Sequence, residues 1–329
     1  MDWTGKKVLV TGAGGFIASH LVEVLVQSGA QVRAFVRYNS RGDIGLLTQL
    51  NPASLREVEV IAGDLRDLPA VEEAVRGVQA VFHLGALIAI PYSYLHPAEV
   101  VETNVIGTLN ILLAARSAET PRVIHTSTSE VYGTALRVPI DEDHPLQGQS
   151  PYSASKIGAD KIAESFYCAY ELPVVTVRPF NTFGPRQSAR AVIPTIISQA
   201  ITSEVLHLGS LDTRRDFTYV SDTVDGFLSA AEAQGVEGQV YNLGTGRDVT
   251  IGEVVQVIGG ILGRELPVVQ EQGRLRPERS EVLRLLSDNR KAQTQLGWQP
   301  RVSLEQGLAQ TVEWIRSNIQ LYRPDQYQR

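Results

Sequence analysis

Apolar residues follow two alternating patterns along the first half of the chain. Short, continuously apolar runs are typical of buried strands, and they alternate with stretches whose apolar residues recur at helical spacing. Strands that alternate with helices predict a parallel sheet covered by helices on both faces. We therefore expect an α/β fold, a Rossmann-type doubly wound parallel sheet, with strands at 7–11, 31–36, 58–62, 80–84, 122–126 and 174–177.

The strict alternation ends after the strand at 174–177. Helical patterns follow at 191–201, 250–262 and 304–319, with a strand at 240–243. They indicate a smaller α/β C-terminal lobe for the substrate. No Pro-, Gly- or Ser-rich linker separates the halves, so we expect the lobes to interleave. The expected NAD(P)-binding domain is 1–180, with about 214–235, and the substrate-binding lobe is 181–213 and 236–329.

A glycine-rich turn follows the first strand and precedes an apolar helix. Gly12 permits a tight turn, Gly15 permits close approach of a pyrophosphate, and Ala18 permits close packing of helix on strand. A strand–turn–helix context is the one in which this motif binds a dinucleotide. The cofactor-binding residues expected here are Gly12, Gly14, Gly15, Phe16 and Ile17.

The end of the second strand bears on the choice between NAD and NADP. NAD sites usually carry an acid there, whereas this chain has Arg37, which suits a 2′-phosphate. This favours NADP over NAD, although an Arg that lies on the adenine of NAD is the alternative. Further cofactor contacts are expected at strand ends and in the helix at 97–116: Asn39, Ser40, Asp64, Leu65, Leu84, Gly85, Ala86, Asn104 and Pro179.

Candidate catalytic residues follow the fifth strand and open the next helix. Tyr152 and Lys156 are one helical turn apart and face the same way. A nearby ammonium favours a phenolate, so we expect Lys156 to lower the pKa of Tyr152 and make it a base. The loop after the strand adds a hydroxyl and a carboxylate. The full catalytic set is Thr128, Ser129, Glu130, Tyr152 and Lys156.

Composition narrows the class of protein. The chain has 329 residues, a net charge of −6 and 43% hydrophobic residues, which is ordinary for a soluble enzyme and disfavours nucleic-acid binding. The single Cys168 excludes an intrachain disulfide and is expected to be a buried small hydrophobe. No His/Cys/Asp cluster has metal-ligand spacing, and His83 is expected to be a packed strand residue. We expect a cytoplasmic protein without membrane contact.

Motifs along almost the whole chain resemble the extended short-chain dehydrogenase/reductase superfamily. They are the opening glycine turn, 63–65, the Ser/Thr loop, Tyr152 with Lys156, 178–181, 215–222, Arg276-Pro277 and 296–298. Within it, the runs 126–133, 151–156 and 180–187 look most like sugar-nucleotide 4,6-dehydratases of the legionaminic-acid type, which act on UDP-N-acetylglucosamine. One departure is Ser129-Glu130, where many dTDP-glucose dehydratases have Asp-Glu.

The resemblance implies a redox-neutral dehydration of a nucleotide sugar. C4 oxidation by Tyr152, Lys156 and Thr128 acidifies C5, Glu130 takes the C5 proton, and water leaves from C6. Glu130 or a water held by Ser129 would assist the leaving hydroxyl. Substrate-binding residues implied by motif position are Asn181, Arg190, Val192, Arg215 and Arg276.

Several alternatives remain open. A 4-epimerase, a UDP-glucuronate decarboxylase and a 5,6-dehydratase share the superfamily, and an idle Rossmann protein that senses NAD(P) is a non-enzyme alternative. The helix at 97–116 carries more apolar surface than one core face needs, which predicts a homodimer through the 97–116 and 151–170 helices.

Overall fold

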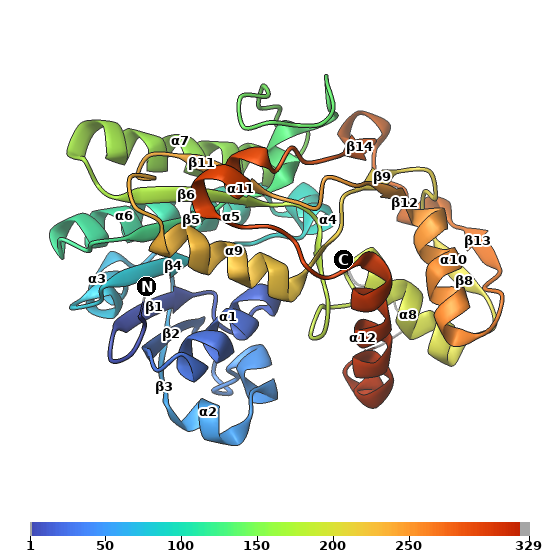
Figure 1. The fold of residues 1–329 in the computed structure, drawn as a ribbon, viewed down its shortest axis with the longest axis horizontal. Helices are drawn as coiled ribbons and strands as arrows, with labels where there is room; N and C mark the ends of the chain where they lie inside the picture. Colours follow the sequence, from blue (N-terminus) through green and yellow to red (C-terminus); the bar gives the residue numbers. More distant parts are fainter. Residues whose placement is uncertain (1, 323–329) are drawn as a thin grey trace.

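The computed structural model describes residues 2–322 and contains a seven-stranded parallel sheet (Figure 1). Its strand order is β3-β2-β1-β4-β5-β6-β11, and every neighbouring pair is parallel. The order reverses between β1 and β4, the place where Rossmann folds bind dinucleotides. The expected fold class is confirmed. The strands are β1 (Lys7–Thr11), β2 (Gln31–Arg37), β3 (Val58–Gly63), β4 (Ala80–His83), β5 (Val123–Thr126), β6 (Val174–Pro179) and β11 (Val240–Leu243).

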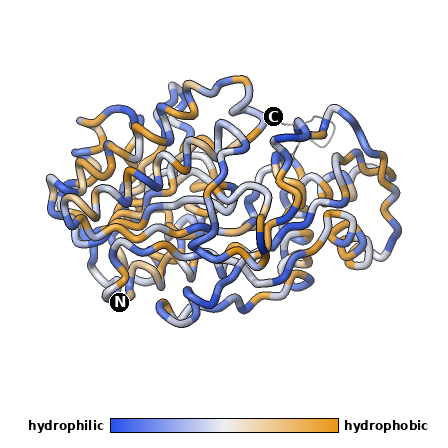
Figure 2. The backbone as a smooth tube through the Cα atoms, turned by 90° about the horizontal axis from the view of Figure 1, so that it is seen from above, coloured by the Kyte–Doolittle hydropathy of each residue, from blue (hydrophilic) through white to orange (hydrophobic). Residues whose placement is uncertain are grey.

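Helices cover both faces of the sheet. One face carries α3 (Leu68–Val75), α6 (Gly107–Ser117) and α7 (Pro151–Tyr170), and the other carries α1 (Phe16–Gln27) and α9 (Val220–Glu232). Alternate residues of β1 feed the two layers, with Val8 and Val10 in one hydrophobic cluster and Leu9 in the other. Hydrophobic and hydrophilic positions alternate along the helices in Figure 2, the pattern of helices with one buried face.

The helix expected at 97–116 is found in three continuous parts. It comprises α5 (Pro97–Val101), a π-helical segment (Glu102–Ile106) and α6. The stretch Pro97–Ser117 is long and apolar enough to cross a membrane, but half of it is buried inside the molecule. It packs on α3 and α7, as a core helix does.

The C-terminal lobe lies at one end of the sheet (Figure 1). Helices α8 (Val192–Thr202), α10 (Ile251–Leu262) and α12 (Leu304–Ser317) pack together. Small sheets pair β8 (Leu206–Leu208) with β13 (Val268–Gln270), and β9 (Arg214–Arg215) with both β12 (Val249–Thr250) and β14 (Arg284–Leu285). The remaining elements include β7 (Thr182–Phe183), β10 (Thr218–Tyr219), α2 (Pro52–Arg56), α4 (Ile90–Leu95) and α11 (Arg290–Leu296).

Local capping explains two helix starts. Ser150 caps α7 in a capping box with Ser153, and Pro151 occupies the first turn, as expected from the sequence. Thr250 and Glu253 form the same reciprocal pair at α10. The cap at Ser150 fixes where α7 begins and so where Tyr152 lies relative to the sheet.

The structure differs from the sequence-based expectations at three places. The segment 240–243, placed in the lobe, supplies the outer strand β11 of the main sheet, while Arg214 and Arg215 belong to a lobe sheet. Cys168 is exposed, because it lies on the outer face of α7. The third place is 42–50, where the sequence also predicts a connecting helix and the structure has only a 3₁₀ turn, Gly45–Gln49.

Three histidines with lowered pKa values are expected to make the folded protein less stable in acid. Burial lowers the pKa of His20 to about 4 and also lowers those of His83 and His125. In the unfolded chain these rings titrate near ~6.5, so the unfolded state binds more protons below that pH. We expect the melting temperature to fall as pH is lowered from about 7 to 5.

The variant His20→Gln removes one of these titrating rings and should therefore reduce the pH dependence of the melting temperature. The glutamine side chain can still donate to the carbonyl of Pro185, which His20 Nε2 contacts at 3.0 Å, so the fold should be kept. The exposed His207→Gln serves as the control. A melting temperature that stays constant over this range in the unaltered protein would contradict the assignment.

Candidate functional site

The expected catalytic side chains converge where β5 ends and α7 begins. Thr128 follows β5 and caps a short 3₁₀ turn, accepting from the backbone N–H of Glu130 at 3.3 Å. Tyr152 lies in the first turn of α7, and its phenol shares a hydrogen bond with the Thr128 side chain. Tyr152 is 7% exposed and Lys156 3% exposed. The hydroxyl of Thr128 and the phenol of Tyr152 therefore meet here, and Lys156 follows one helical turn later, almost fully shielded from water.

The expected effect of Lys156 on Tyr152 is not found. Burial raises the pKa of Tyr152, and the charges of Glu130 and Asp160 raise it further, while the hydrogen bond with Thr128 lowers it only in part. The expectation was wrong because spacing on a helix does not report desolvation, which dominates here. Tyr152 needs a further positive charge nearby before it can act as a base.

Lys156 is held by the backbone of the strand end. Its Nζ donates to the carbonyl oxygen of Thr126 at 2.6 Å. Burial lowers the pKa of Lys156 to about 8, and the carboxylate of Asp160, one turn further along α7, opposes that fall. The ammonium form therefore persists near neutral pH.

The two other residues of the loop have different surroundings. Ser129 is only 2% exposed, whereas Glu130 is half-buried. The carboxylate of Glu130 interacts electrostatically with Tyr152 and with the guanidinium of Arg215. Glu130 thus interacts with both the phenol of Tyr152 and a cation of the C-terminal lobe, while Ser129 is packed inward.

Two arginines from the lobe share one acid. Arg215 Nη2 contacts Glu281 Oε1 at 3.3 Å, and Arg276 Nη1 lies 3.7 Å from the same oxygen. Arg215 is 6% exposed, and burial lowers its pKa. Arg276 Nη1 is buried without a hydrogen-bond partner in the described part of the chain. The buried guanidinium of Arg215 and the half-buried one of Arg276 thus share one oxygen of Glu281, and both can bind a further anion.

The other expected substrate residues are placed less uniformly. Asn181 lies just past β6, and its Oδ1 is buried without a hydrogen-bond partner among residues 2–322. Its backbone carbonyl accepts from the N–H of Thr218, close in sequence to Arg215. Arg190 is exposed, and its Nε donates to Ser188 Oγ at 3.4 Å, while Val192 is the half-buried first residue of α8. Asn181 therefore fits the site better than Arg190.

The glycine turn forms a cradle that fits a dinucleotide. Gly12 has φ +65°, and a Cβ there would lie 2.7 Å from Gly85 Cα. Gly15 precedes α1 and is exposed; in the described residues this helix has neither a side-chain cap nor an acid in its first turn. Phe16 and Ile17 begin the helix, so their N–H groups are those that lack intrahelical acceptors. A pyrophosphate finds both space and donors here.

Side chains at the end of β2 and β3 already have partners. Arg37 Nη2 contacts Glu99 Oε1 at 3.2 Å but remains 64% exposed, and Asp64 is paired with Arg66 at 2.7 Å. Asn39 holds its own loop, accepting from two backbone N–H groups, and Ser40 is exposed. Gly14 packs on this loop, since a Cβ would lie 2.8 Å from the carbonyl oxygen of Ile44.

Asn104 and Leu65 support the cradle from behind. Asn104 donates to Leu87 and Ser155 and accepts from the N–H of Leu87, so it ties the loop after β4 to α7. Leu65 lies beneath Gly85, where an added Cβ would be 2.7 Å from its Cδ1. Leu84, Ala86 and Pro179 are half-buried at strand ends. A residue outside the expected set is Thr11, whose hydroxyl accepts from the N–H of Gly85 at 3.0 Å.

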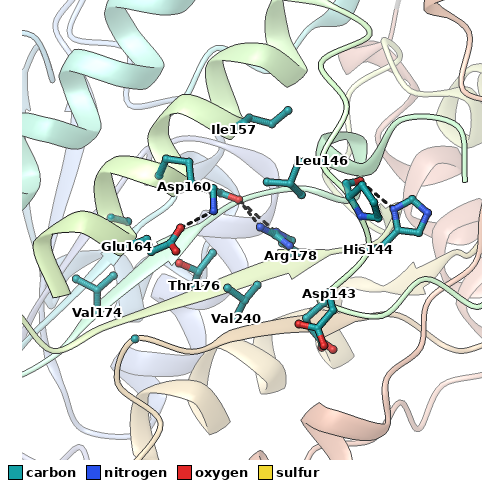
Figure 3. Close-up of a pocket in the computed structure, with 15 residues that line it drawn as sticks. Asp143, His144, Leu146, Ile157, Asp160, Glu164, Val174, Thr176, Arg178 and Val240 are labelled. Carbon is teal, nitrogen blue, oxygen red and sulfur yellow. Dashed lines mark hydrogen bonds and ion pairs between the residues drawn. The ribbon is translucent and has the colours of Figure 1, made fainter. Parts of the chain in front are cut away.

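A separate cavity of about 530 Å³ lies beside α7 (Figure 3). The loop at 142–146, β6 and β11 complete its wall, and Asp160 and Arg178 lie at its edge. The cradle glycines, Thr128 and Tyr152 do not line it. Within residues 2–322, no group of His, Cys, Asp and Glu is arranged to hold a metal ion.

Known proteins are similar to this chain in sequence and in fold over nearly its full length. The model of the GDP-mannose 4,6-dehydratase family matches residues 9–311. A UDP-glucose 4-epimerase from Mycolicibacterium smegmatis is 34% identical and a dTDP-D-glucose 4,6-dehydratase from Mus musculus is 33% identical, each over 95% of this chain and covering 100% and 90% of those proteins.

Solved structures agree with this assignment. A dTDP-glucose 4,6-dehydratase from Streptomyces venezuelae, solved with NAD, superposes with a TM-score of 0.85 at 30% identity, covering 97% of this chain and 99% of that one. The family match, the strand order and the glycine cradle coincide with the resemblance drawn from the motifs. The chain is therefore an enzyme of the extended short-chain dehydrogenase/reductase superfamily and belongs to the GDP-mannose 4,6-dehydratase family.

Proposed function

We propose that the protein is a sugar-nucleotide 4,6-dehydratase that forms a 4-keto-6-deoxy sugar nucleotide. The observation that carries the proposal is the place of Glu130, a carboxylate that interacts with both Tyr152 and Arg215. C4 oxidation needs only Thr128, Tyr152 and Lys156, whereas elimination across C5 and C6 also needs a base beside C5. The motif resemblance nominates UDP-N-acetylglucosamine as the substrate.

The proposed chemistry assigns one task to each side chain. Tyr152 takes the proton of the C4 hydroxyl, and Thr128 orients that oxygen by a hydrogen bond. Lys156 supplies positive charge and binds the nicotinamide ribose. Glu130 takes the C5 proton and passes it to the C6 hydroxyl, which leaves as water, and C5 regains a proton from solvent when hydride is returned to C6. A bound nicotinamide dinucleotide, held by the glycine cradle of Gly12, Gly14 and Gly15, would supply the hydride acceptor for C4 and the hydride donor for C6.

Arg215 and Arg276 are proposed to bind the diphosphate. Their guanidinium groups share Glu281, and a diphosphate would bring more negative charge than this single carboxylate supplies. Asn181 offers its unpartnered Oδ1 as an acceptor for a sugar hydroxyl. Arg190 is retained as a weaker candidate, and Val192 as an apolar contact at the start of α8.

A 4-epimerase is the second candidate, since a UDP-glucose 4-epimerase is as similar to this chain as the dehydratase relative. Epimerisation needs no carboxylate to take the C5 proton, so Glu130 favours elimination. A decarboxylase or a 5,6-dehydratase would also employ an acid in this loop.

Product mass separates these outcomes. The purified protein is incubated with UDP-N-acetylglucosamine, UDP-glucose, UDP-glucuronate, dTDP-glucose and GDP-mannose, and each product is analysed by mass spectrometry. Loss of water with formation of a 4-keto group supports the proposal. An unchanged mass with inverted C4 indicates an epimerase, loss of carbon dioxide indicates a decarboxylase, and either result would overturn the dehydratase assignment.

Cofactor preference is tested at Arg37. The exposed guanidinium suits a 2′-phosphate, so we propose that NADP binds somewhat more tightly than NAD. Arg37→Ala is expected to weaken NADP binding by about 10-fold, the equivalent of about 1.4 kcal/mol, and NAD binding by much less. Fluorescence titration with both dinucleotides measures this. An equal effect on both would show that Arg37 does not recognise the 2′-phosphate and would contradict the proposed preference for NADP.

The proposal includes a homodimer that acts in the cytoplasm. Exposed apolar side chains on the 97–116 and 151–170 helices, Val101, Ile106, Tyr167 and Tyr170, support a homodimer through these helices. We expect the protein to act in the cytoplasm, where nucleotide sugars are made, without nucleic-acid or membrane partners.

A further inference from the structure

A fully buried charged cluster lies directly behind the catalytic side chains. Asp160, on α7, is 5% exposed and accepts hydrogen bonds from three residues. Ser127 Oγ donates at 2.8 Å and His125 Nε2 lies at 3.0 Å. Arg178 contacts the same carboxylate at 2.9 Å and 3.2 Å (Figure 3). The proposed chemistry assigns no task to Asp160.

The partners of Asp160 come from three different elements. His125 belongs to β5, Ser127 to the loop that carries Thr128 and Glu130, and Arg178 to β6, whereas Asp160 itself lies on α7. Tyr152, Lys156 and Asp160 follow one another at intervals of four residues along that helix and so share a face. The carboxylate of Asp160 therefore connects α7, which carries Tyr152, to the loop that carries Glu130.

Charge gives Asp160 a second effect on the site. Arg178 donates to the phenol oxygen of Tyr132 at 2.8 Å as well as to Asp160, so its hydrogen bonds are divided between these two residues. Burial opposes ionisation of Asp160, but the hydrogen bond from His125 and the charges of Arg178 and Lys156 lower its pKa to about 2. Asp160 is thus an anion, and its field counteracts the effect of burial on Lys156.

We propose that Asp160 is a positioning residue: it fixes the Thr128–Glu130 loop against α7 and keeps the buried Lys156 in its ammonium form. This inference rests on the proposed function. Its effect on catalysis is indirect, through the side chains it holds. A small misplacement of reacting groups lowers a rate strongly, so the bonds to Ser127 and His125 matter beyond stability.

The test compares Asp160→Asn with Glu164→Gln. Asparagine keeps the shape and one acceptor but removes the charge, while Glu164 is an exposed acid on the same helix, 55% exposed, paired with Lys161. For Asp160→Asn we expect kcat to fall by about 10- to 100-fold with a nearly unchanged KM. The alkaline limb of its pH–kcat profile should move to lower pH, because Lys156 has lost its anionic neighbour. Glu164→Gln should change neither.

A readout without turnover accompanies the kinetics. The Kd for NAD is measured by fluorescence titration across the same pH range, and Asp160→Asn is expected to lose affinity at a lower pH than the unaltered protein. An unchanged kcat, or a fall in kcat with an unshifted pH profile, would overturn the proposal and leave Asp160 with a purely structural role.

Ser127→Ala keeps the proposal testable if Asp160→Asn does not fold. It removes one hydrogen bond to Asp160 and no charge, so kcat should fall less and the alkaline limb should stay in place. An unchanged kcat for Ser127→Ala would contradict the positioning of the loop. All rates are compared on whichever sugar nucleotide the unaltered protein converts, so failure of the dehydratase assignment is read separately, from product mass.

Discussion

Glu130→Gln is expected to abolish loss of water while leaving C4 oxidation partly active. Glutamine keeps the size of the side chain but cannot take the C5 proton, and a general base contributes about 10²–10⁴-fold to a rate. Formation of the 4-keto-6-deoxy product should fall by that factor. Reduced nicotinamide should accumulate, since Thr128, Tyr152 and Lys156 remain in place. Absorbance of the reduced cofactor and product mass measure the two steps.

The control for this variant is Glu313→Gln, a loss of the same charge at a side chain that is 68% exposed on α12. It should leave both steps unchanged. If Glu130→Gln releases water as fast as the unaltered enzyme, Glu130 is not the base and the proposed function loses its main support.

Tyr152→Phe should block the sequence one step earlier. Phenylalanine preserves the ring but removes the hydroxyl that bonds to Thr128, so no group takes the C4 proton. We expect turnover to fall by about 10²–10⁴-fold, with no accumulation of reduced nicotinamide. This absence separates the Tyr152 variant from the Glu130 variant in a single-turnover experiment.

Tyr167→Phe is the matched control, because Tyr167 lies on the same helix and is 37% exposed. Its turnover should equal that of the unaltered protein. If Tyr152→Phe still reduces the cofactor at the normal rate, another group accepts the C4 proton and the assignment of Tyr152 as base is wrong.

Much of the fold follows from local patterns in the sequence. Strands β1 to β6 and the start of α7 were predicted because apolar periodicity, Ser150 and Pro151 act over a few residues. The place of β11 was not predicted, because the pairing of Val240–Leu243 with β6 joins parts of the chain far apart in sequence. Short strands with such distant partners carry no local signal of their sheet.

The sequence predicts which residues belong to the candidate site, but it does not predict their pKa values. The glycine cradle, Thr128, Tyr152 and Lys156 follow from spacing and turn chemistry. The raised pKa of Tyr152 does not, since it depends on how completely the folded chain excludes water. The role of Asp160 has no signal in the sequence, because an acid one turn after a lysine is common on helices. Its three partners become neighbours only when β5, β6 and α7 assemble.

Strand β11 also determines whether a shortened chain can form the complete sheet. A fragment that stops near residue 180 keeps the cradle, but β6 loses β11 and presents unpaired backbone groups along its edge. Such a fragment would self-associate through that edge rather than persist as a stable dinucleotide-binding module. Autonomous expression of either half is therefore a poor engineering strategy, and swaps of substrate lobes between relatives should retain residues 240–243 with the body that they complete.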